Sequence, residues 1–588
     1  MLSHLVSVII PGDLWWNALT YRAESDLIPG VRVKIKLRNS ERVGFVVPNE
    51  IIYKGSRINN IIQVLDDKCK IDRDLWNLAI WAGHESLCGT GAALQTILPK
   101  PILDGWKISD GFKKALQSEF KYTGFYNPFE NVRYKFYLEQ LNKPGQNLLI
   151  FPLKESAKEF YNDLPDDLKN NSVLWSGNIW QIWQDVHNNK FKNVISAPGG
   201  IFAPIKPDRI IIEDDSCPFY KMPRSPKINL IRIAEKRAEI LNAEFITGGR
   251  MPSGYIYKKY APDEILKPER KNIILADVND KKIFNENIKG IEGNLKITRS
   301  ILKRSIKNII SGKNVFWILN RYGEAAEIKC DNCGNILTCK KCGAKLRVTD
   351  SGEKSECPEC GDVKKIPDTC PICNIGILKG KILGLGSLFE VAKKYFPAEN
   401  LILYKGKNLK KLKYPSLILG TFGLLNQAEK LKPGLISWLN FDAELFRQEY
   451  ITEFKAFRNL SESYWRGNKS NEDSDRKILI QAGHNGIKFA SKFYSGFKYF
   501  WDNELKLREE FILPPFGLMI EITCKNEIRA ELINDLKMAG IFVSYQDENS
   551  PLFINIEHEE LNLIYDVLAK YFYIKNISNA PDVKIYDM

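Results

Sequence analysis

The chain has 588 residues, of which 44% are hydrophobic, 27% charged and 11% aromatic, and this globular composition excludes a disordered or collagen-like protein. Its length predicts several domains rather than one. Lys and Arg number 85 against 71 Asp and Glu, a formal charge of +14 that favours a polyanion such as nucleic acid as partner, although a solvated lysine-rich surface gives the same count.

The N-terminal residues 1–100 predict a β-rich domain. Residues 5–10 form an apolar strand, and residues 30–37 alternate apolar and basic side chains with the period of two that marks a half-buried strand. Residues 71–98 predict a helix. We expect the basic side chains of the second strand on its solvent face: Arg32, Lys34 and Lys36.

No apolar run reaches the ~20 residues needed to cross a bilayer. The first residues carry neither a basic leader nor a small-residue cleavage site, so they predict a strand rather than a signal peptide. The 12 cysteines are then expected as reduced thiols, which makes metal ligands more plausible than disulfides. These features favour a cytoplasmic protein.

After residue 100 the chain alternates strands and helices, the pattern of parallel sheets covered by helices. The fold class expected is therefore a multi-domain α/β protein. The predicted segments are a linker at 101–126, a first α/β domain at 127–265, a second at 266–327 and 376–500, a cysteine-rich insert at 328–375 and a C-terminal α+β domain at 501–588. The predicted strands are 147–151, 193–196, 209–212, 314–319, 401–404, 416–419 and 435–440, and the predicted helices 131–142, 154–163 and 227–242.

The insert carries the most specific motif of the sequence, four C-x-x-C pairs: Cys330, Cys333, Cys339, Cys342, Cys357, Cys360, Cys370 and Cys373. Two pairs make one tetrahedral four-thiolate site, so the motif predicts two structural zinc ions with no open coordination position. The spacing favours a nested arrangement, in which the inner pairs share one ion and the outer pairs the other. One alternative is that neighbouring C-x-x-C pairs, or knuckles, share each ion. The other is an iron–sulfur cluster in place of zinc. Four isolated cysteines are expected as packing residues: Cys69, Cys88, Cys217 and Cys524.

These pairs follow the run Phe316-Trp317-Ile318-Leu319-Asn320-Arg321-Tyr322-Gly323, and together they resemble the primosomal protein N′ (PriA) family of bacterial replication-restart helicases. The resemblance continues through Tyr21, 30–33, 42–44, 203–215, 439–443 and 513–516. It implies an N-terminal 3′-end DNA-binding domain, two RecA-like helicase lobes and the two-zinc insert. It also implies that one zinc is held by Cys330, Cys333, Cys370 and Cys373 and the other by Cys339, Cys342, Cys357 and Cys360.

The phosphate-binding loop of such a helicase is degenerate in this sequence. The pattern G-x-x-x-x-G-K-[ST] does not occur, and the equivalent segment has Arg133 in place of the lysine and Tyr134 in place of the magnesium-binding hydroxyl. Glu130 and Val132 would block the close approach of the backbone to phosphate. The linker is also too short for the winged-helix domain usual in the family.

Other parts of the nucleotide site survive only in part. Glu213 and Asp214 keep carboxylates at a strand end, and Arg466 remains from the arginine-finger motif, which has Trp465 in place of glycine. We expect Arg133, Glu213, Asp214 and Arg466 to be a vestigial nucleotide site with no catalytic residue, no ATPase activity and no bound ATP or Mg²⁺.

Basic and aromatic side chains near the N-terminus are candidates for DNA contacts, since cations neutralise phosphates and exposed rings stack on bases. They are Trp15, Trp16, Tyr21, Lys34, Lys36 and Arg42. The alternative for the three rings is that they are core residues. The basic and aromatic stretch 492–501 predicts a packed helix, and Trp175, Trp180 and Trp183 receive no role.

The expected function is that of a replication-restart protein that recognises abandoned forks and recruits the primosome and the replicative helicase or its loader, as a nucleoid-associated scaffold rather than a motor. One alternative is an active ATP-dependent 3′-to-5′ helicase with an atypical nucleotide site. The other is a zinc-stabilised DNA-binding regulator that has left replication restart.

Overall fold

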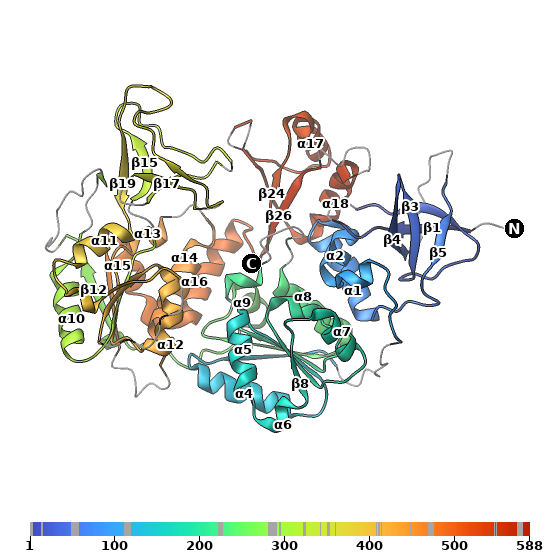
Figure 1. Cartoon of the computed structure of the whole chain (residues 1–588), viewed down its shortest axis with the longest axis horizontal. Helices are drawn as coiled ribbons and strands as arrows, with labels where there is room; N and C mark the ends of the chain where they lie inside the picture. The colour runs from blue at the N-terminus through green and yellow to red at the C-terminus, as the bar shows by residue number, and fades with distance from the viewer. Residues whose placement is uncertain are drawn as a thin grey trace. The chain divides into compact units, whose positions relative to one another are not determined.

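The computed structural model describes the chain except residues 1–3, 13–15, 49–57, 111–118, 222–226, 228, 280–290, 293–295, 322–324, 342, 350–352, 359, 407–408, 410–411, 413, 447–448, 469–475, 546, 549, 573–579 and 588 (Figure 1). Contacts divide the chain into two compact units. The first comprises 1–127, 132–263 and 501–588, and the second comprises 128–131 and 264–500. Among the described residues, no helix is both long and apolar enough to cross a membrane.

The first unit begins with an antiparallel five-stranded sheet of order β2-β1-β4-β3-β5. Its strands are β1 (His4–Ile9), β2 (Leu19–Ala23), β3 (Arg32–Leu37), β4 (Ser40–Val47) and β5 (Ile61–Val64). Alternate side chains such as Val6, Val8, Val33 and Ile35 form its core. The predicted strands at 5–10 and 30–37 therefore exist within one residue or two of their expected limits.

The segment predicted as one helix at 71–98 forms two helices, α1 (Arg73–Glu85) and α2 (Gly89–Ile97), followed by α3 (Lys100–Leu103). The break has a backbone cause, because Leu87 and Gly89 both have positive φ, 47° and 76°. At Gly89 an added Cβ would lie 2.6 Å from the Trp16 ring. The close approach therefore requires glycine, and the local apolar pattern gave no sign of it.

The prediction that Arg32 lies on the solvent face of its strand is wrong, because its side chain is buried. Its Nε and Nη2 donate to Asp66 at 2.8 and 2.9 Å, and its Nη1 donates to the backbone carbonyls of Ile102 and Trp106, both at 2.9 Å. The strand period predicted exposure, but the chain after α3 folds back over the start of β3. One guanidinium thus joins the sheet to the residues that follow it.

A parallel sheet of order β6-β11-β10-β7-β9-β8 forms the next part of the first unit. Its strands are β6 (Lys121–Tyr126), β7 (Asn147–Ile150), β8 (Ser172–Leu174), β9 (Asn193–Ser196), β10 (Arg209–Glu213) and β11 (Glu244–Gly249). The accompanying helices are α4 (Glu130–Asn142), α5 (Lys154–Asn162), α6 (Asp166–Lys169), α7 (Ile179–His187), α8 (Leu230–Leu241) and α9 (Gly254–Tyr260). The position of β6 contradicts the predicted linker at 101–126, because residues 121–126 are an edge strand of this sheet.

The C-terminal part completes the first unit with an antiparallel sheet of order β25-β24-β26. Its elements are α16 (Gly496–Glu510), β24 (Leu518–Thr523), α17 (Asn526–Met538), β25 (Leu552–Ile556), α18 (Leu561–Ala569) and β26 (Asp582–Tyr586). Its core also includes Trp16 and Leu87 from the other end of the chain. Trp501 in α16 is fully buried and donates to the carbonyl of Pro252 at 3.1 Å, as expected for a packed helix.

The second unit contains a parallel sheet of order β12-β23-β22-β14-β21-β20. Its strands are β12 (Ile273–Asp277), β14 (Val315–Ile318), β20 (Leu401–Leu403), β21 (Leu417–Gly420), β22 (Leu435–Trp438) and β23 (Lys477–Ala482). Its helices are α10 (Arg299–Ile310), α11 (Leu385–Ala392), α12 (Ala428–Leu431), α13 (Asp442–Leu445), α14 (Thr452–Trp465) and α15 (His484–Ala490). The central strands β14, β21 and β22 are buried along their whole length, as a sheet covered on both faces requires.

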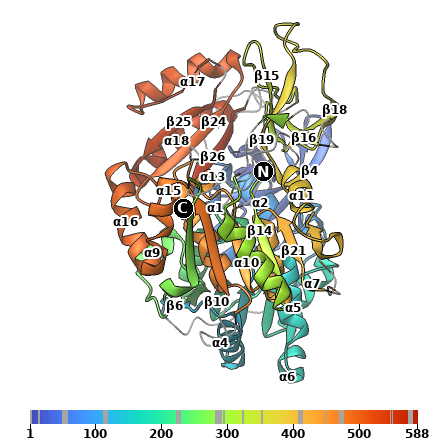
Figure 2. The same ribbon diagram turned by 90° about the vertical axis from the view of Figure 1, so that its left-hand side faces the viewer.

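The cysteine-rich insert extends from this sheet as a smaller one of order β13-β19-β15-β16-β17-β18 (Figure 2). Its strands are β13 (Ile291–Glu292), β15 (Ala325–Cys330), β16 (Arg347–Thr349), β17 (Lys354–Glu356), β18 (Val363–Lys365) and β19 (Leu378–Leu383). The antiparallel pair β15 and β19 forms its stem. The insert is therefore longer at both ends than the cysteines alone indicated, because its stem has no cysteine except Cys330.

The burial of Arg32 generates a stability prediction. In the Asp66→Ala variant the guanidinium stays buried without its carboxylate, and we expect a loss of about 3–5 kcal/mol. Hydrogen exchange followed by mass spectrometry on peptides from β3 and β5 measures this loss as a lower free energy of opening. The control is Glu41→Ala, which removes an exposed partner of Lys34 and leaves exchange unchanged. Equal protection in Asp66→Ala and wild type would contradict the assignment.

Candidate functional site

The outer cysteine pairs gather at the end of the β15–β19 stem that begins with the pair Cys330 and Leu378. The Sγ atoms of Cys330, Cys333, Cys370 and Cys373 all lie within 4.8 Å of one another. The Sγ atoms of Cys330 and Cys373 are 3.7 Å apart, as are those of Cys333 and Cys370. A tetrahedral ion with Zn–S bonds of about 2.3 Å separates its sulfurs by roughly 3.8 Å. The donor set and its spacing therefore fit a zinc ion.

The knuckle backbone also suits thiolate ligands. The amides of Ile375 and Gly376 lower the pKa of Cys373 to about 6. The amide of Cys373 is the main cause of the lowered pKa of Cys370. Both shifts favour the thiolate, which is the form that binds metal, whereas burial and the neighbouring thiols raise the pKa of Cys333. Gly334 and Asn374 follow two of the pairs with φ of 72° and 58°, the left-handed backbone expected after a knuckle.

The inner pairs form a second cluster farther along the insert. The Sγ atoms of Cys339, Cys357 and Cys360 lie within 4.8 Å of one another, and those of Cys339 and Cys360 are 3.6 Å apart. Cys342 lies outside the described residues. The structure thus brings the outer pairs together and two inner knuckles together, which is the nested rather than the adjacent arrangement.

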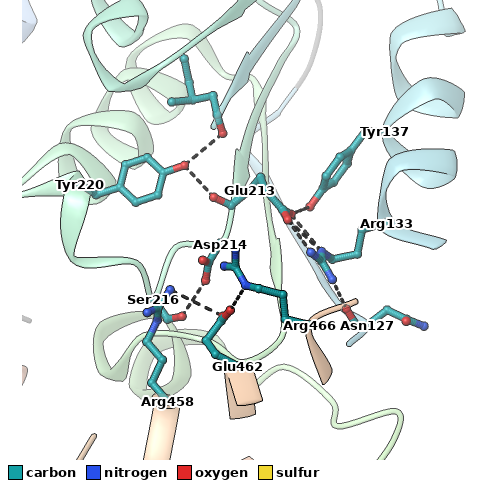
Figure 3. A network of polar contacts seen from close by, with 11 residues as sticks. Asn127, Arg133, Tyr137, Glu213, Asp214, Ser216, Tyr220, Arg458, Glu462 and Arg466 are labelled. Atoms are coloured by element: carbon teal, nitrogen blue, oxygen red, sulfur yellow. Dashed lines mark hydrogen bonds and ion pairs between the residues drawn. The ribbon is translucent and has the colours of Figure 1, made fainter. Parts of the chain in front are cut away.

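The residue in place of the phosphate-binding lysine is part of a buried ion pair (Figure 3). Arg133 in α4 has no exposed surface, and its Nη2 and Nε donate to the Glu213 carboxylate at 2.6 and 3.0 Å. Its Nη1 donates to the carbonyl of Asn127 at 2.7 Å. Tyr137, one turn further along α4, donates to the same carboxylate at 2.6 Å. No sequence motif indicated Tyr137, although its spacing of four from Arg133 puts both residues on one helix face.

This network includes two of the residues that the sequence predicts as a vestigial nucleotide site, Arg133 and Glu213. Glu213 ends β10, and its oxygens accept hydrogen bonds from Arg133 and Tyr137. Burial and the neighbouring Glu213 carboxylate raise the pKa of Tyr137 well above its usual value, so the phenol stays a donor. At Gly248 an added Cβ would lie 2.3 Å from the Tyr137 hydroxyl oxygen, so this network also depends on a glycine.

The two acidic residues after Glu213 are likewise held by local groups. Asp214 has a positive φ of 56° and accepts from the Ser216 hydroxyl at 2.9 Å. Asp215 is buried and accepts from the Tyr126 hydroxyl at 2.7 Å and the Ser253 amide at 2.8 Å. Burial raises the pKa of Asp215 to about 7 despite these donors. This carboxyl therefore carries a proton for part of the time at neutral pH.

Arg466 lies at the end of α14 in the second unit. Its Nε donates to Glu462 at 2.5 Å, one turn earlier in the same helix, and its Nη1 donates to Asn426 at 3.0 Å. Beside it, Trp465 is buried and meets Phe129 edge to face with ring centroids 5.6 Å apart. A bulky ring thus fills the position where the motif of the resembled family has glycine.

The candidate DNA-binding residues divide into two groups. Lys34, Lys36 and Arg42 lie on neighbouring strands with Lys36 and Arg42 exposed, and Lys34 forms a 2.6 Å ion pair with Glu41. Trp16 and Tyr21 are core residues, which corrects their assignment as stacking rings. Trp16 stacks on Phe572 at 4.4 Å. Trp15 lies outside the described residues.

The four isolated cysteines are buried to different degrees. Cys88 and Cys217 are buried, and Cys69 and Cys524 are partly buried, in keeping with packing roles.

Comparison with known proteins identifies the first domain. Residues 7–99 match the family model of the PriA 3′ DNA-binding domain, whose description is 3′DNA-binding domain. The match covers the five-stranded sheet and continues through α2. Among solved structures, a point variant of Saccharomyces cerevisiae Dbp5 bound to RNA and ADP BeF3 aligns with 76% of this chain and 98% of its own at 9% identity, with a TM-score of only 0.30.

Curated relatives match further along the chain. The replication restart protein PriA of Rickettsia conorii is 23% identical over 89% of this chain and 86% of its own. PriA of Bacillus subtilis is 22% identical over 60% of this chain, and PriA of Borreliella burgdorferi is 23% identical over 60%. The matches span 46% and 54% of those two proteins, about half of their lengths. With the matched DNA-binding domain, these similarities support a member of the PriA family.

Proposed function

We propose that this protein is a replication-restart factor that binds abandoned DNA forks and promotes assembly of the primosome and reloading of the replicative helicase. The observation that carries the proposal is the match of residues 7–99 to a 3′ DNA-binding domain in a chain similar to replication restart proteins. Its partners are forked DNA, primosome proteins and the replicative helicase or its loader, and its location is the bacterial nucleoid in the cytoplasm.

We further propose that the protein works as a scaffold and not as a motor. The two parallel sheets would be helicase lobes of the RecA type that have lost the means to bind phosphate. Arg133 supports this view, because its positive charge is already neutralised by the Glu213 carboxylate and is not available to a nucleotide. Phosphoryl transfer also depends on an arginine finger, worth roughly a thousandfold or more in rate, and Arg466 is engaged by Glu462.

The zinc ions would be structural. Four thiolates close a tetrahedral site and leave no position for water or substrate. Cys330, Cys333, Cys370 and Cys373 would hold one ion and Cys339, Cys342, Cys357 and Cys360 the other. Each ion would fix knuckles that β15 and β19 alone leave unsupported, so that the insert presents a rigid surface to DNA or to a partner protein.

Particular observations support two alternative functions, an active helicase and a DNA-binding regulator. Glu213 and Asp214 still place carboxylates at the end of β10, as an active helicase would need. The matched DNA-binding domain would serve equally well in a DNA-binding regulator outside replication restart. A pull-down without any primosome component would favour the regulator.

Fork binding tests the proposal directly. We expect the affinity for a labelled fork, measured by anisotropy, to fall steeply as salt rises from about 50 to 200 mM, because cations released from phosphates drive binding. Changing Lys34, Lys36 and Arg42 together to Ala lowers the salt slope by about 2–3. Lys393→Ala, which removes another exposed lysine, is the control and leaves the slope unchanged. An affinity insensitive to salt contradicts phosphate binding.

Nucleotide binding separates scaffold from motor. We expect no heat on titration with ATP and Mg²⁺, and no ATP hydrolysis above background with forked DNA present. Turnover above about 1 per second that disappears in both Arg133→Ala and Arg466→Ala would refute the proposal. Circular dichroism checks that each variant is folded, because Arg133→Ala leaves Glu213 buried without its cation and lowers the free energy of unfolding by about 3–5 kcal/mol.

Metal analysis tests the two sites and their pairing. We expect two zinc ions per chain by mass spectrometry of the purified protein, and one in Cys333→Ser. The double variant Cys333→Ser/Cys373→Ser distinguishes the arrangements, since nested sites keep one ion and adjacent sites lose both. Cys524→Ser is the control and keeps two. Fewer than two ions in wild type, or iron with visible absorbance, would contradict the assignment.

A further inference from the structure

A short ladder of rings connects the surface of the first unit with its core. Trp106, after α3, is 56% exposed and meets Trp180 edge to face with centroids 5.9 Å apart. Trp180 stacks on Trp183 at 5.6 Å, and Trp183 stacks on His187 at 4.6 Å. Trp183 is 2% exposed and His187 3%. These residues of α7 therefore form a fixed base for the outermost ring.

The backbone that carries Trp106 is held on both sides of the residue. Its carbonyl accepts from the buried Arg32 at 2.9 Å, and its amide donates to the carbonyl of Pro101 at 2.9 Å. Three residues later, the backbone carbonyl of Ser109 accepts from the His187 ring at 3.1 Å, and the Ser109 hydroxyl donates to the side chain of Asn188 at 3.0 Å. Gly105, with φ of 85°, makes the turn before it.

Packing in the core explains the presence of Trp183, whereas more than half of the Trp106 side chain is exposed to solvent. A large ring half exposed on an anchored backbone loses little conformational entropy when a flat partner covers it. Base rings are such partners, and stacking on an aromatic side chain is worth about 1–3 kcal/mol per base. The next residue, Lys107, is exposed and can approach the phosphate of a stacked nucleotide.

The surroundings of the ring favour nucleic acid. Trp106 lies just beyond the matched DNA-binding domain at 7–99 and is bonded to Arg32 within that domain. The acidic Asp110 nearby is neutralised by Lys70 at 2.6 Å and by Lys68 at 3.1 Å. Asp104 is the acidic residue close in sequence for which the structure gives no cation. A strand can therefore pass the ring without facing a run of like charges.

We propose that Trp106 is a stacking platform for an unpaired base of single-stranded DNA, with Lys107 contacting the adjacent phosphate and Trp180 supporting the ring from behind. The inference rests on the proposed function, since it specifies how the DNA of a fork is held. It also gives Trp180 and Trp183 a role, as the support of that platform.

The experiment compares a labelled oligothymidine with a blunt duplex of equal length, using the full chain. We expect Trp106→Ala to weaken single-strand binding about tenfold and duplex binding less than twofold, with Trp106→Phe close to wild type. Lys107→Ala lowers the single-strand salt slope by about 0.7. Phe542→Ala, which removes a ring that is 82% exposed in the C-terminal part, is the control and changes neither affinity.

Crosslinking of wild type to a strand containing 5-iodouracil gives a readout that needs no variant, and a crosslinked peptide containing Trp106 supports the platform. Equal affinities of Trp106→Ala and wild type, equal losses on strand and duplex, or crosslinks confined to other peptides would overturn it. If wild type binds the fork but Trp106→Ala binds as tightly, only this inference fails. If wild type binds no DNA, the proposed function fails with it.

Discussion

The buried ion pair between Arg133 and Glu213 is the constraint on which the centre of the first unit depends. It joins α4 to the end of β10 and recruits Tyr137 and the carbonyl of Asn127. Such a pair adds little stability over apolar packing, but removing one partner is costly because the other charge stays buried. The site is therefore difficult to change one residue at a time.

The order of the elements was predictable because it follows from periodicity. Buried parallel strands such as 147–151 and 209–212 are apolar runs between helical segments, and they occur as β7 and β10. The cysteine spacing similarly favoured the sulfurs that gather, since four C-x-x-C pairs can combine into two four-thiolate sites in only a few ways. In both cases the information is local or nearly so.

What the sequence concealed depends on contacts between distant residues. Arg32 alternates with lysines as an exposed residue would, yet Asp66 and two carbonyls beyond α3 bury it. The edge strand β6 was assigned to a linker because one short polar-apolar run carries no sign of the strand it pairs with. Trp16 resembled a DNA-stacking ring until its partner Phe572 was known. No window of local sequence contains both members of these pairs.

The last of these contacts bears on how the chain acquires its structure. Trp16 and Leu87 belong to the same apolar core as β24, β25 and α18, and the Trp16 ring also stacks on Tyr565 at 4.7 Å. A ribosome releases the early residues long before it makes the late ones. The Trp16 side chain therefore stays uncovered until the C-terminal part of the chain has been translated. During that time the first domain is accessible to chaperones and proteases.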